Sequence, residues 1–264
     1  MSLLRDKARQ TARRFGIDAR LRALRTANAG SVPLDGHRLP PASIRLGGHN
    51  FADDRAFLDA AVRDARRLEE TCGVHGASRV LDIGCGVGRL PIGLRAHFGT
   101  LAGYTGVDVD AGCIGWCRKN LGGTGATFVH VDLANERYNP SGAAIAGGFS
   151  LPLPDRSFDV VHLYSVFSHM VTGDARAYLR EFRRLLAPDG RVFLTAFIED
   201  GVEDMAINPQ GYGSFPGEWE GALHCVRFDR AFFDGMVRDA GLSVERFDHA
   251  SDTDGQSAVF LRAA

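Results

Sequence analysis

Apolar runs and amphipathic segments alternate along most of the chain from residue 51 onward. The segment from Phe51 to Cys72 has apolar residues at helical spacing, and Asn50 precedes it as a candidate cap. The predicted strands cover about residues 79–83, 103–108, 126–131, 158–164 and 190–197, and the predicted helices about 88–97, 110–120, 173–186 and 228–240. This alternation predicts an α/β fold with a doubly wound, Rossmann-like, mostly parallel sheet.

The two ends of the chain have different patterns. Near the C-terminus, the apolar runs Leu242–Phe247 and Ser257–Leu261 flank a turn-rich segment and predict an antiparallel hairpin. Residues 1–28 are rich in arginine, which indicates a solvated basic helix or, alternatively, a surface that docks on an anionic substrate, partner or membrane. Residues 29–50 contain several prolines and glycines and predict an extended linker without regular structure. We therefore divide the chain into an appendage, 1–50, expected to cover the cofactor or substrate, and a catalytic domain, 51–264.

A glycine-rich turn joins the first of these strands to the following helix. The segment reads VLDIGCGVGRL from Val80 to Leu90, with Gly84, Gly86 and Gly88 at alternate positions. Glycines permit the backbone angles of a tight strand-to-helix turn and the close approach of a ligand, and the helix that follows directs free N–H groups toward it. Asp82 lies two residues before the first glycine, Asp108 ends the next strand, and Asp132 ends the one after. Three carboxylates around one pocket disfavour a pyrophosphate and suit a ligand with cationic groups and ribose hydroxyls.

Five segments in order resemble the class I S-adenosylmethionine-dependent methyltransferase family over about residues 78–198. They read VLDIGCGVGRL, GVDVD, FVHVDLAN, LPLPDRSFDVVHLYSVFSHM and LREFRRLLAPDGRVFLTAF. The resemblance implies S-adenosyl-L-methionine as the cofactor, with the glycine loop along its methionine part and the carboxylate of Asp108 on the ribose hydroxyls. It further implies that Asp82 acts on the ammonium group directly or through water, and that Val109 packs against the adenine. Asp132 with Leu133 would meet the adenine amino edge, with a cap of the following turn as the alternative role for Asp132. The full set of expected cofactor-binding residues is Asp82, Gly84, Cys85, Gly86, Gly88, Asp108, Val109, Asp132, Leu133 and Ser165.

The segment after the fourth strand bears on the methyl acceptor. It reads Tyr164-Ser165-Val166-Phe167-Ser168-His169 and lacks the Asn/Asp-Pro-Pro-Tyr/Phe tetrapeptide with which some relatives bind an amino group. An oxygen or carbon acceptor is therefore favoured. Transfer to an alcohol gains from a base, for which His169 and His224 are the candidates, and the rate should then fall below about pH 6.5. The alternative role for His169 is to tie its loop to the cofactor region. His130 and His162 lie within strands and are interpreted as core histidines.

Two irregular segments are expected to shape the acceptor site: the turn-rich residues 136–142 after the third strand and residues 199–223 after the fifth. The second of these segments is interpreted as a lid. It carries Tyr212, Phe215 and Trp219, several glycines, and four acidic residues that we interpret as a solvated charge run and not as metal ligands. The five cysteines include no C-x-x-C pair; Cys113 and Cys117, one helical turn apart, are assigned to the core, although a metal half-site has the same spacing. The sequence thus predicts no metal.

The amino-acid composition argues against two classes of partner, nucleic acids and the membrane interior. A net charge of −1 argues against a nucleic-acid partner, and no apolar run reaches the length of a transmembrane segment. The N-terminal sequence lacks the apolar stretch of a secretory signal, so we expect a cytoplasmic protein of unknown oligomeric state. The sequence predicts an S-adenosylmethionine-dependent methyltransferase that acts on a small molecule or glycan, with O-methylation favoured. The alternatives are a relative of the same fold that binds the cofactor without methyl transfer and, less favoured, a nicotinamide oxidoreductase.

Overall fold

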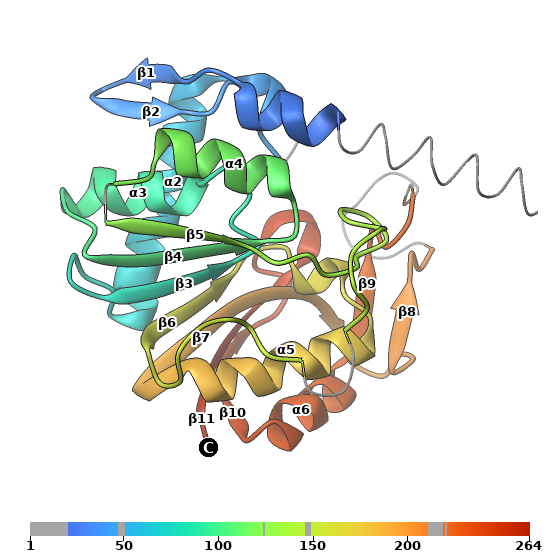
Figure 1. Ribbon diagram of the computed structural model, residues 1–264. Helices are drawn as coiled ribbons and strands as arrows, with labels where there is room; N and C mark the ends of the chain where they lie inside the picture. Colours follow the sequence, from blue (N-terminus) through green and yellow to red (C-terminus); the bar gives the residue numbers. More distant parts are fainter. Residues whose placement is uncertain (1–20, 47–50, 124, 146–148, 211–218, 220) are drawn as a thin grey trace, which may run out of the picture.

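The central sheet confirms the predicted fold. The computed structural model describes residues 21–46, 51–123, 125–145, 149–210, 219 and 221–264. The parallel strands are β3 (Arg79–Ile83), β4 (Gly103–Asp108), β5 (Ala126–His130), β6 (Phe158–Leu163) and β7 (Leu186–Glu199). Strands β10 (Leu242–Asp248) and β11 (Ser257–Ala263) form the predicted antiparallel hairpin, and β11 pairs with β7. The order is β10-β11-β7-β6-β3-β4-β5, so the chain reverses direction across the sheet between β3 and β6 (Figure 1).

Helices cover both faces of the sheet (Figure 1). One side carries α2 (Asp54–Cys72), α3 (Arg89–Phe98) and α4 (Ala111–Asn120), and the other α5 (Thr172–Leu185) and α6 (Arg230–Asp239). Helix α2 begins later than expected, because Asp53 caps it by accepting a hydrogen bond of 2.7 Å from the backbone N–H of Ala56. The predicted cap, Asn50, lies outside the described residues. Each helical layer buries its own apolar cluster against the sheet.

Helices α2 and α3 approach so closely that only glycine fits at their crossing. A Cβ atom at Gly93 would lie 1.9 Å from the carbonyl oxygen of Ala61. We expect Gly93→Ala to lower the free energy of unfolding by about 1–3 kcal/mol, because the helices must separate to admit the methyl group. Gly173→Ala, in helix α5 where a Cβ meets nothing within 4 Å, is the matched control and should leave the stability unchanged or slightly higher. Equal melting temperatures for the two variants in thermal unfolding would contradict this packing account.

The N-terminal segment is more ordered than the sequence suggests. Residues 21–28 are helical, and β1 (Val32–Leu34) pairs with β2 (His37–Leu39) where an irregular linker was predicted. The hairpin forms because Asp35 and Gly36 both adopt positive φ angles, of 50° and 78°, as its two-residue turn requires. The indole N–H of Trp116 in α4 donates to the carbonyl of Gly30 at 2.9 Å. The segment therefore packs on helix α4 (Figure 1).

The predicted lid also contains regular structure. Strand β8 (Met205–Ile207) lies within it and pairs with β9 (Val226–Asp229), which extends the sheet beside the end of β7. The predicted lid aromatics Tyr212 and Phe215 lie outside the described residues, whereas Trp219 is half-buried against Phe197. Three short 3-10 turns complete the described elements: η1 (Ala42–Ile44), η3 (Phe167–His169) and η4 (Thr253–Gly255).

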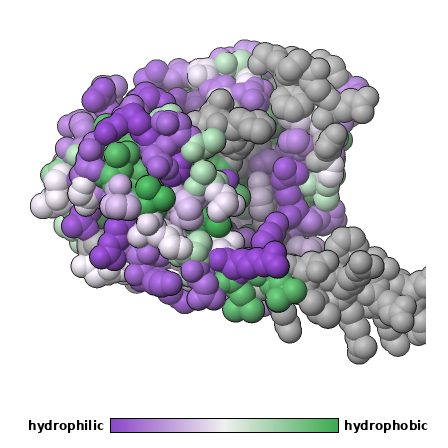
Figure 2. All heavy atoms as spheres, turned by 90° about the horizontal axis from the view of Figure 1, so that it is seen from above, coloured by the Kyte–Doolittle hydropathy of each residue, from purple (hydrophilic) through white to green (hydrophobic). Residues whose placement is uncertain are grey.

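The surface over the N-terminal elements is mostly hydrophilic, with small hydrophobic groups between the polar side chains (Figure 2). Within the part of the chain that the structure describes, no helix is both long and apolar enough to cross a membrane.

Candidate active site

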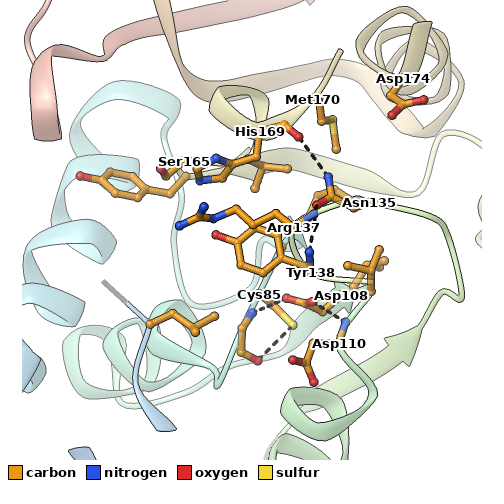
Figure 3. A pocket seen from close by; sticks show the side chains of 18 of the residues that line it. Cys85, Asp108, Asp110, Asn135, Arg137, Tyr138, Ser165, His169, Met170 and Asp174 are labelled. Atoms are coloured by element: carbon orange, nitrogen blue, oxygen red, sulfur yellow. Dashed lines mark hydrogen bonds between the residues drawn. The ribbon is translucent and has the colours of Figure 1, made fainter. Parts of the chain in front are cut away.

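One cavity lies at the carboxyl ends of the parallel strands, where the strand order reverses. Its volume is about 720 Å³, and its walls come from the loops after β3, β4, β5 and β6, from the N-terminal segment and from the segment before β11. An open α/β sheet binds its ligands at this position. Figure 3 shows side chains from these loops converging on the cavity.

The glycine loop forms the floor of the cavity. The backbone N–H groups of Gly84 and Cys85 both donate to the carbonyl of Val107, at 2.7 and 3.1 Å, which folds the loop back onto β4. A Cβ atom at Gly84 would lie 2.5 Å from the side chain of Val166, and one at Gly88 would lie 2.4 Å from that of Leu121. Packing within the protein thus requires glycine at both positions. Gly88 was expected to line the cofactor site, but it is not part of the cavity wall.

Gly86 is the glycine of the loop that opens toward the cavity. An added Cβ would meet only the side chain of Leu46, at 3.5 Å. Cys85 lines the cavity beside it, and burial raises the pKa of its thiol well above the usual range. This part of the loop therefore offers bare backbone to a ligand and no reactive thiolate.

Asp108 lies where the sequence places it, at the end of β4 and in the cavity wall. Its carboxylate accepts hydrogen bonds from the backbone N–H groups of Gly86 at 2.7 Å and Asp110 at 2.8 Å (Figure 3). Burial raises its pKa to about 6, while the two backbone hydrogen bonds oppose that increase. Each oxygen keeps a further lone pair, so the carboxylate can still accept from two hydroxyl groups.

Asp82 does not line the cavity. It is buried below the glycine loop, where it accepts a hydrogen bond from Tyr104 Oη at 2.5 Å and lies 2.8 Å from Nδ1 of His162. Of the two predicted roles, a direct contact with an ammonium group is not the arrangement in this structure, and a role through water stays a prediction. His162 is buried, as expected of a core histidine, and Asp82 fixes the loop from beneath.

Asp132 also points away from the cavity. Its side chain is exposed and accepts a hydrogen bond of 2.9 Å from Asn139 Nδ2, which also donates to the carbonyl of Leu133 at 3.0 Å. Asp132 thus helps to hold the turn-rich loop after β5. Leu133 and Val109, predicted to flank the adenine, do line the cavity.

Ser165 belongs to a polar network in the cavity wall. Its φ of 57° is unusual for a residue other than glycine, and its backbone N–H donates to Thr195 Oγ1 at 2.8 Å. Its Oγ accepts from Gln256 Nε2 at 2.9 Å and lies 3.1 Å from Ser168 Oγ. These bonds hold the strained turn and its hydroxyl in one orientation.

The two candidate bases lie together at the cavity. His169 Nδ1 donates to the carbonyl of Leu223 at 2.8 Å, so the neutral ring carries its proton on Nδ1 and leaves Nε2 able to accept one. Burial lowers the pKa of His169 to about 4. The ring of His224 lies 5.3 Å from that of Trp219, centroid to centroid, and also lines the cavity. The expected fall in rate below about pH 6.5 assumed the ordinary pKa of imidazole, and the lowered pKa of His169 does not fit that expectation.

Several cavity residues were not predicted. Asp174 and Tyr178 lie one turn apart on α5, and burial raises the pKa of both side chains. Figure 3 shows Asp174 on the side of the cavity away from Cys85 and Asp108. The sequence offers no signal for Asp174, since an acidic residue in a first helical turn is common. The other cavity residues that were not predicted include Arg89, Asn135 and Gln256, whereas Arg137 and Tyr138 belong to the segment 136–142 that was expected to shape the acceptor site.

The cysteines give no sign of a metal site. All five are free and buried, including Cys113 and Cys117 of α4. Among the described residues, no three His, Cys, Asp or Glu side chains cluster in a way that could hold a metal ion.

The sheet order, the glycine loop and the carboxylate at the end of the second parallel strand define a class I S-adenosylmethionine-dependent methyltransferase. The methyltransferase domain family matches residues 18–246, and the chain belongs to this family. The chain is 26% identical to 27-O-demethylrifamycin SV methyltransferase of Amycolatopsis mediterranei, over 77% of this chain and 68% of that enzyme. It is 32% identical to a fatty-acid O-methyltransferase of Mycolicibacterium smegmatis, over 44% of this chain and 36% of that enzyme. An S-adenosylmethionine-dependent methyltransferase of Leishmania major shares the fold, with a TM-score of 0.55 and 15% identity over 84% of this chain and 78% of that one.

Proposed function

We propose that the cavity binds S-adenosylmethionine and that the enzyme methylates an oxygen atom of a small molecule. The observation that carries the proposal is the Asp108 carboxylate, fixed by two backbone N–H groups beside the open floor at Gly86. The family match supports methyl transfer. An oxygen acceptor on a small molecule is in line with the names of two curated relatives, 27-O-demethylrifamycin SV methyltransferase and fatty-acid O-methyltransferase.

The residues present fit this cofactor. Asp108 would accept hydrogen bonds from the ribose hydroxyls, and the apolar side chains of Val109 and Leu133 would flank the adenine. The cavity volume of about 720 Å³ lies within the range of pockets that hold a molecule of this size. When bound, the cofactor supplies an electrophilic methyl group on sulfur.

The protein contributes orientation and a proton acceptor. The carbonyl of Leu223 fixes the tautomer of His169, so that Nε2 can take a proton from an acceptor hydroxyl. Asn135 Nδ2 donates to the carbonyl of His169 at 3.0 Å and ties the loop after β5 to the loop after β6. These bonds hold the imidazole in one place, which favours alignment with the methyl group.

A buried arginine holds the N-terminal cover in place. The Arg45 side chain is 1% exposed and donates to the carbonyls of Pro40 at 2.9 Å and Phe51 at 2.8 Å, with a further ion pair to Asp54. Leu46 and Phe51, on either side of residues 47–50, both line the cavity. Leu46 is 54% exposed although it lies over Gly86, so a bound cofactor would bury it.

We expect Arg45→Met to weaken binding of S-adenosylhomocysteine by about fivefold to thirtyfold, because the cover loses its hydrogen bonds to the start of α2. Arg55→Met is the control, since Arg55 pairs with Asp35 at the exposed surface. Isothermal titration at a temperature where both variants are folded measures the effect. Unchanged affinity in Arg45→Met would show that this segment does not cover the cofactor.

The acceptor chemistry needs a direct test. Wild-type enzyme and S-adenosylmethionine would be incubated with hydroxylated, carboxylated and amine-bearing small molecules, and S-adenosylhomocysteine release would be measured with product mass. Product masses with one added methyl group on hydroxyl or carboxyl compounds support the proposal. Methylation confined to the amines would contradict O-methylation.

A further inference from the structure

Two arginines among the described residues line the cavity, one on a loop and one at the start of a helix. Arg137 belongs to the loop after β5, with its guanidinium carbon 5.7 Å from the ring centroid of Tyr138. Arg89 follows the last glycine of the glycine loop and begins α3. Its guanidinium carbon lies 5.2 Å from the ring centroid of Phe51 and 5.0 Å from that of Tyr164. The cavity therefore has one cation beside the glycine loop and another beside His169.

Arg89 lines the cavity, and an ion pair holds its side chain in place. Its Nη1 forms an ion pair of 2.5 Å with Oδ2 of Asp64 in α2, and its side chain is 21% exposed. A guanidinium has five N–H donors, so an ion pair through Nη1 leaves donors for a ligand. The two aromatic rings restrict the side chain further. Arg89 is thus a positioned cation with hydrogen-bonding capacity left over.

The strand order gives the direction in which the cofactor would lie. Val109 and Leu133, the residues suited to the adenine, follow β4 and β5, and Asp108 ends β4. The next strands in the sheet are β3 and then β6. A cofactor with its ribose at Asp108 and its adenine toward β5 must extend its amino-acid end toward β3 and β6. Arg89 and Tyr164 lie there.

We infer that Arg89 binds the carboxylate of the amino-acid end of the cofactor, an inference that rests on the proposed function. A carboxylate that leaves water needs a cation or several hydrogen-bond donors, and guanidinium can supply both. The N-terminus of α3, where Arg89 stands, adds a favourable field for the same negative charge. The site therefore selects adenosyl compounds that retain this carboxylate.

The test compares two ligands that differ in the amino-acid part. S-adenosylhomocysteine carries the carboxylate, whereas 5′-deoxy-5′-methylthioadenosine keeps the adenosine and lacks the amino acid. Replacing Arg89 alone would leave Asp64 buried without its partner, so the variant is Asp64→Asn/Arg89→Met, with Asp64→Asn as its matched control. Isothermal titration should show S-adenosylhomocysteine affinity about tenfold to a hundredfold lower in the double variant than in the control. Affinity for methylthioadenosine should be the same in both.

Three results would overturn the inference about Arg89, and each differs from the result that would refute the proposed function. Equal loss of both ligands would make Arg89 a residue that maintains the cavity shape, and unchanged affinity for both would leave the carboxylate to other groups. If Arg137→Met loses S-adenosylhomocysteine selectively and the double variant does not, then the cofactor lies in the opposite direction. Failure of the wild-type protein to bind either compound would instead refute the proposed function itself.

Discussion

Replacing Asp108 by alanine is expected to weaken binding of S-adenosylhomocysteine by about 1.5–3 kcal/mol, which is about tenfold to 150-fold in the dissociation constant. The carboxylate provides the acceptors for two ribose hydroxyls, and its loss also leaves the N–H groups of Gly86 and Asp110 without their partner. Isothermal titration of both proteins measures the difference. Unchanged affinity would remove Asp108 from the ribose site.

The same carboxylate should make cofactor binding depend on pH. Burial raises the pKa of Asp108 to about 6, so the group is ionised above that pH and gains a proton as the pH falls through it. The protonated form offers fewer acceptors to the ribose. Affinity should therefore decline below about pH 6, by up to about tenfold per pH unit. Asp108→Asn has no carboxyl proton to gain and should bind with an affinity that changes much less over this range.

Replacing His169 by alanine is expected to lower the rate of methyl transfer to a hydroxyl acceptor by about 10²- to 10⁴-fold, while affinity for S-adenosylhomocysteine changes little. Because the pKa of His169 is lowered to about 4, the imidazole stays neutral at all higher pH values. The wild-type rate at saturating cofactor should thus show no inflection from His169 between about pH 5.5 and 8. An inflection near 6.5, the reference value for imidazole, would assign the titrating step to another group.

His224→Ala is the comparison that decides between the two bases. Both rings line the same cavity, but His169 has its tautomer fixed by the carbonyl of Leu223. A large rate loss in His224→Ala with normal activity in His169→Ala would reverse the assignment. Full activity in both variants would exclude an imidazole base, and Asp174, a half-buried carboxylate in the same cavity, would become the next residue to replace.

The sequence predicted the sheet and the floor of the cavity because these depend on local patterns. Alternating apolar strands and amphipathic helices fix the doubly wound order, and a carboxylate at the end of a strand must lie near the loop after the neighbouring strand. Asp108 shows this directly, since it accepts from the N–H of Gly86 across two adjacent parallel strands. The N-terminal hairpin was missed, although the sequence contains a signal for it, because the Asp35-Gly36 pair is typical of a two-residue turn.

The directions in which the side chains point could not be predicted from the sequence. Asp82 and Asp132 occupy the expected positions, but Tyr104 and His162 bind the first from below, and Asn139 binds the second on the solvent side. These partners lie on other elements or seven residues away, and no periodicity indicates them. The low pKa of His169 likewise follows from burial by segments distant in the sequence.

The most direct test of the account is a crystal structure of the enzyme with S-adenosylhomocysteine. We expect the nucleoside to lie in the cavity, with both ribose hydroxyls within hydrogen-bond distance of the Asp108 carboxylate and the adenine between Val109 and Leu133. A nucleoside bound elsewhere, or one in the cavity whose ribose does not contact Asp108, would contradict it.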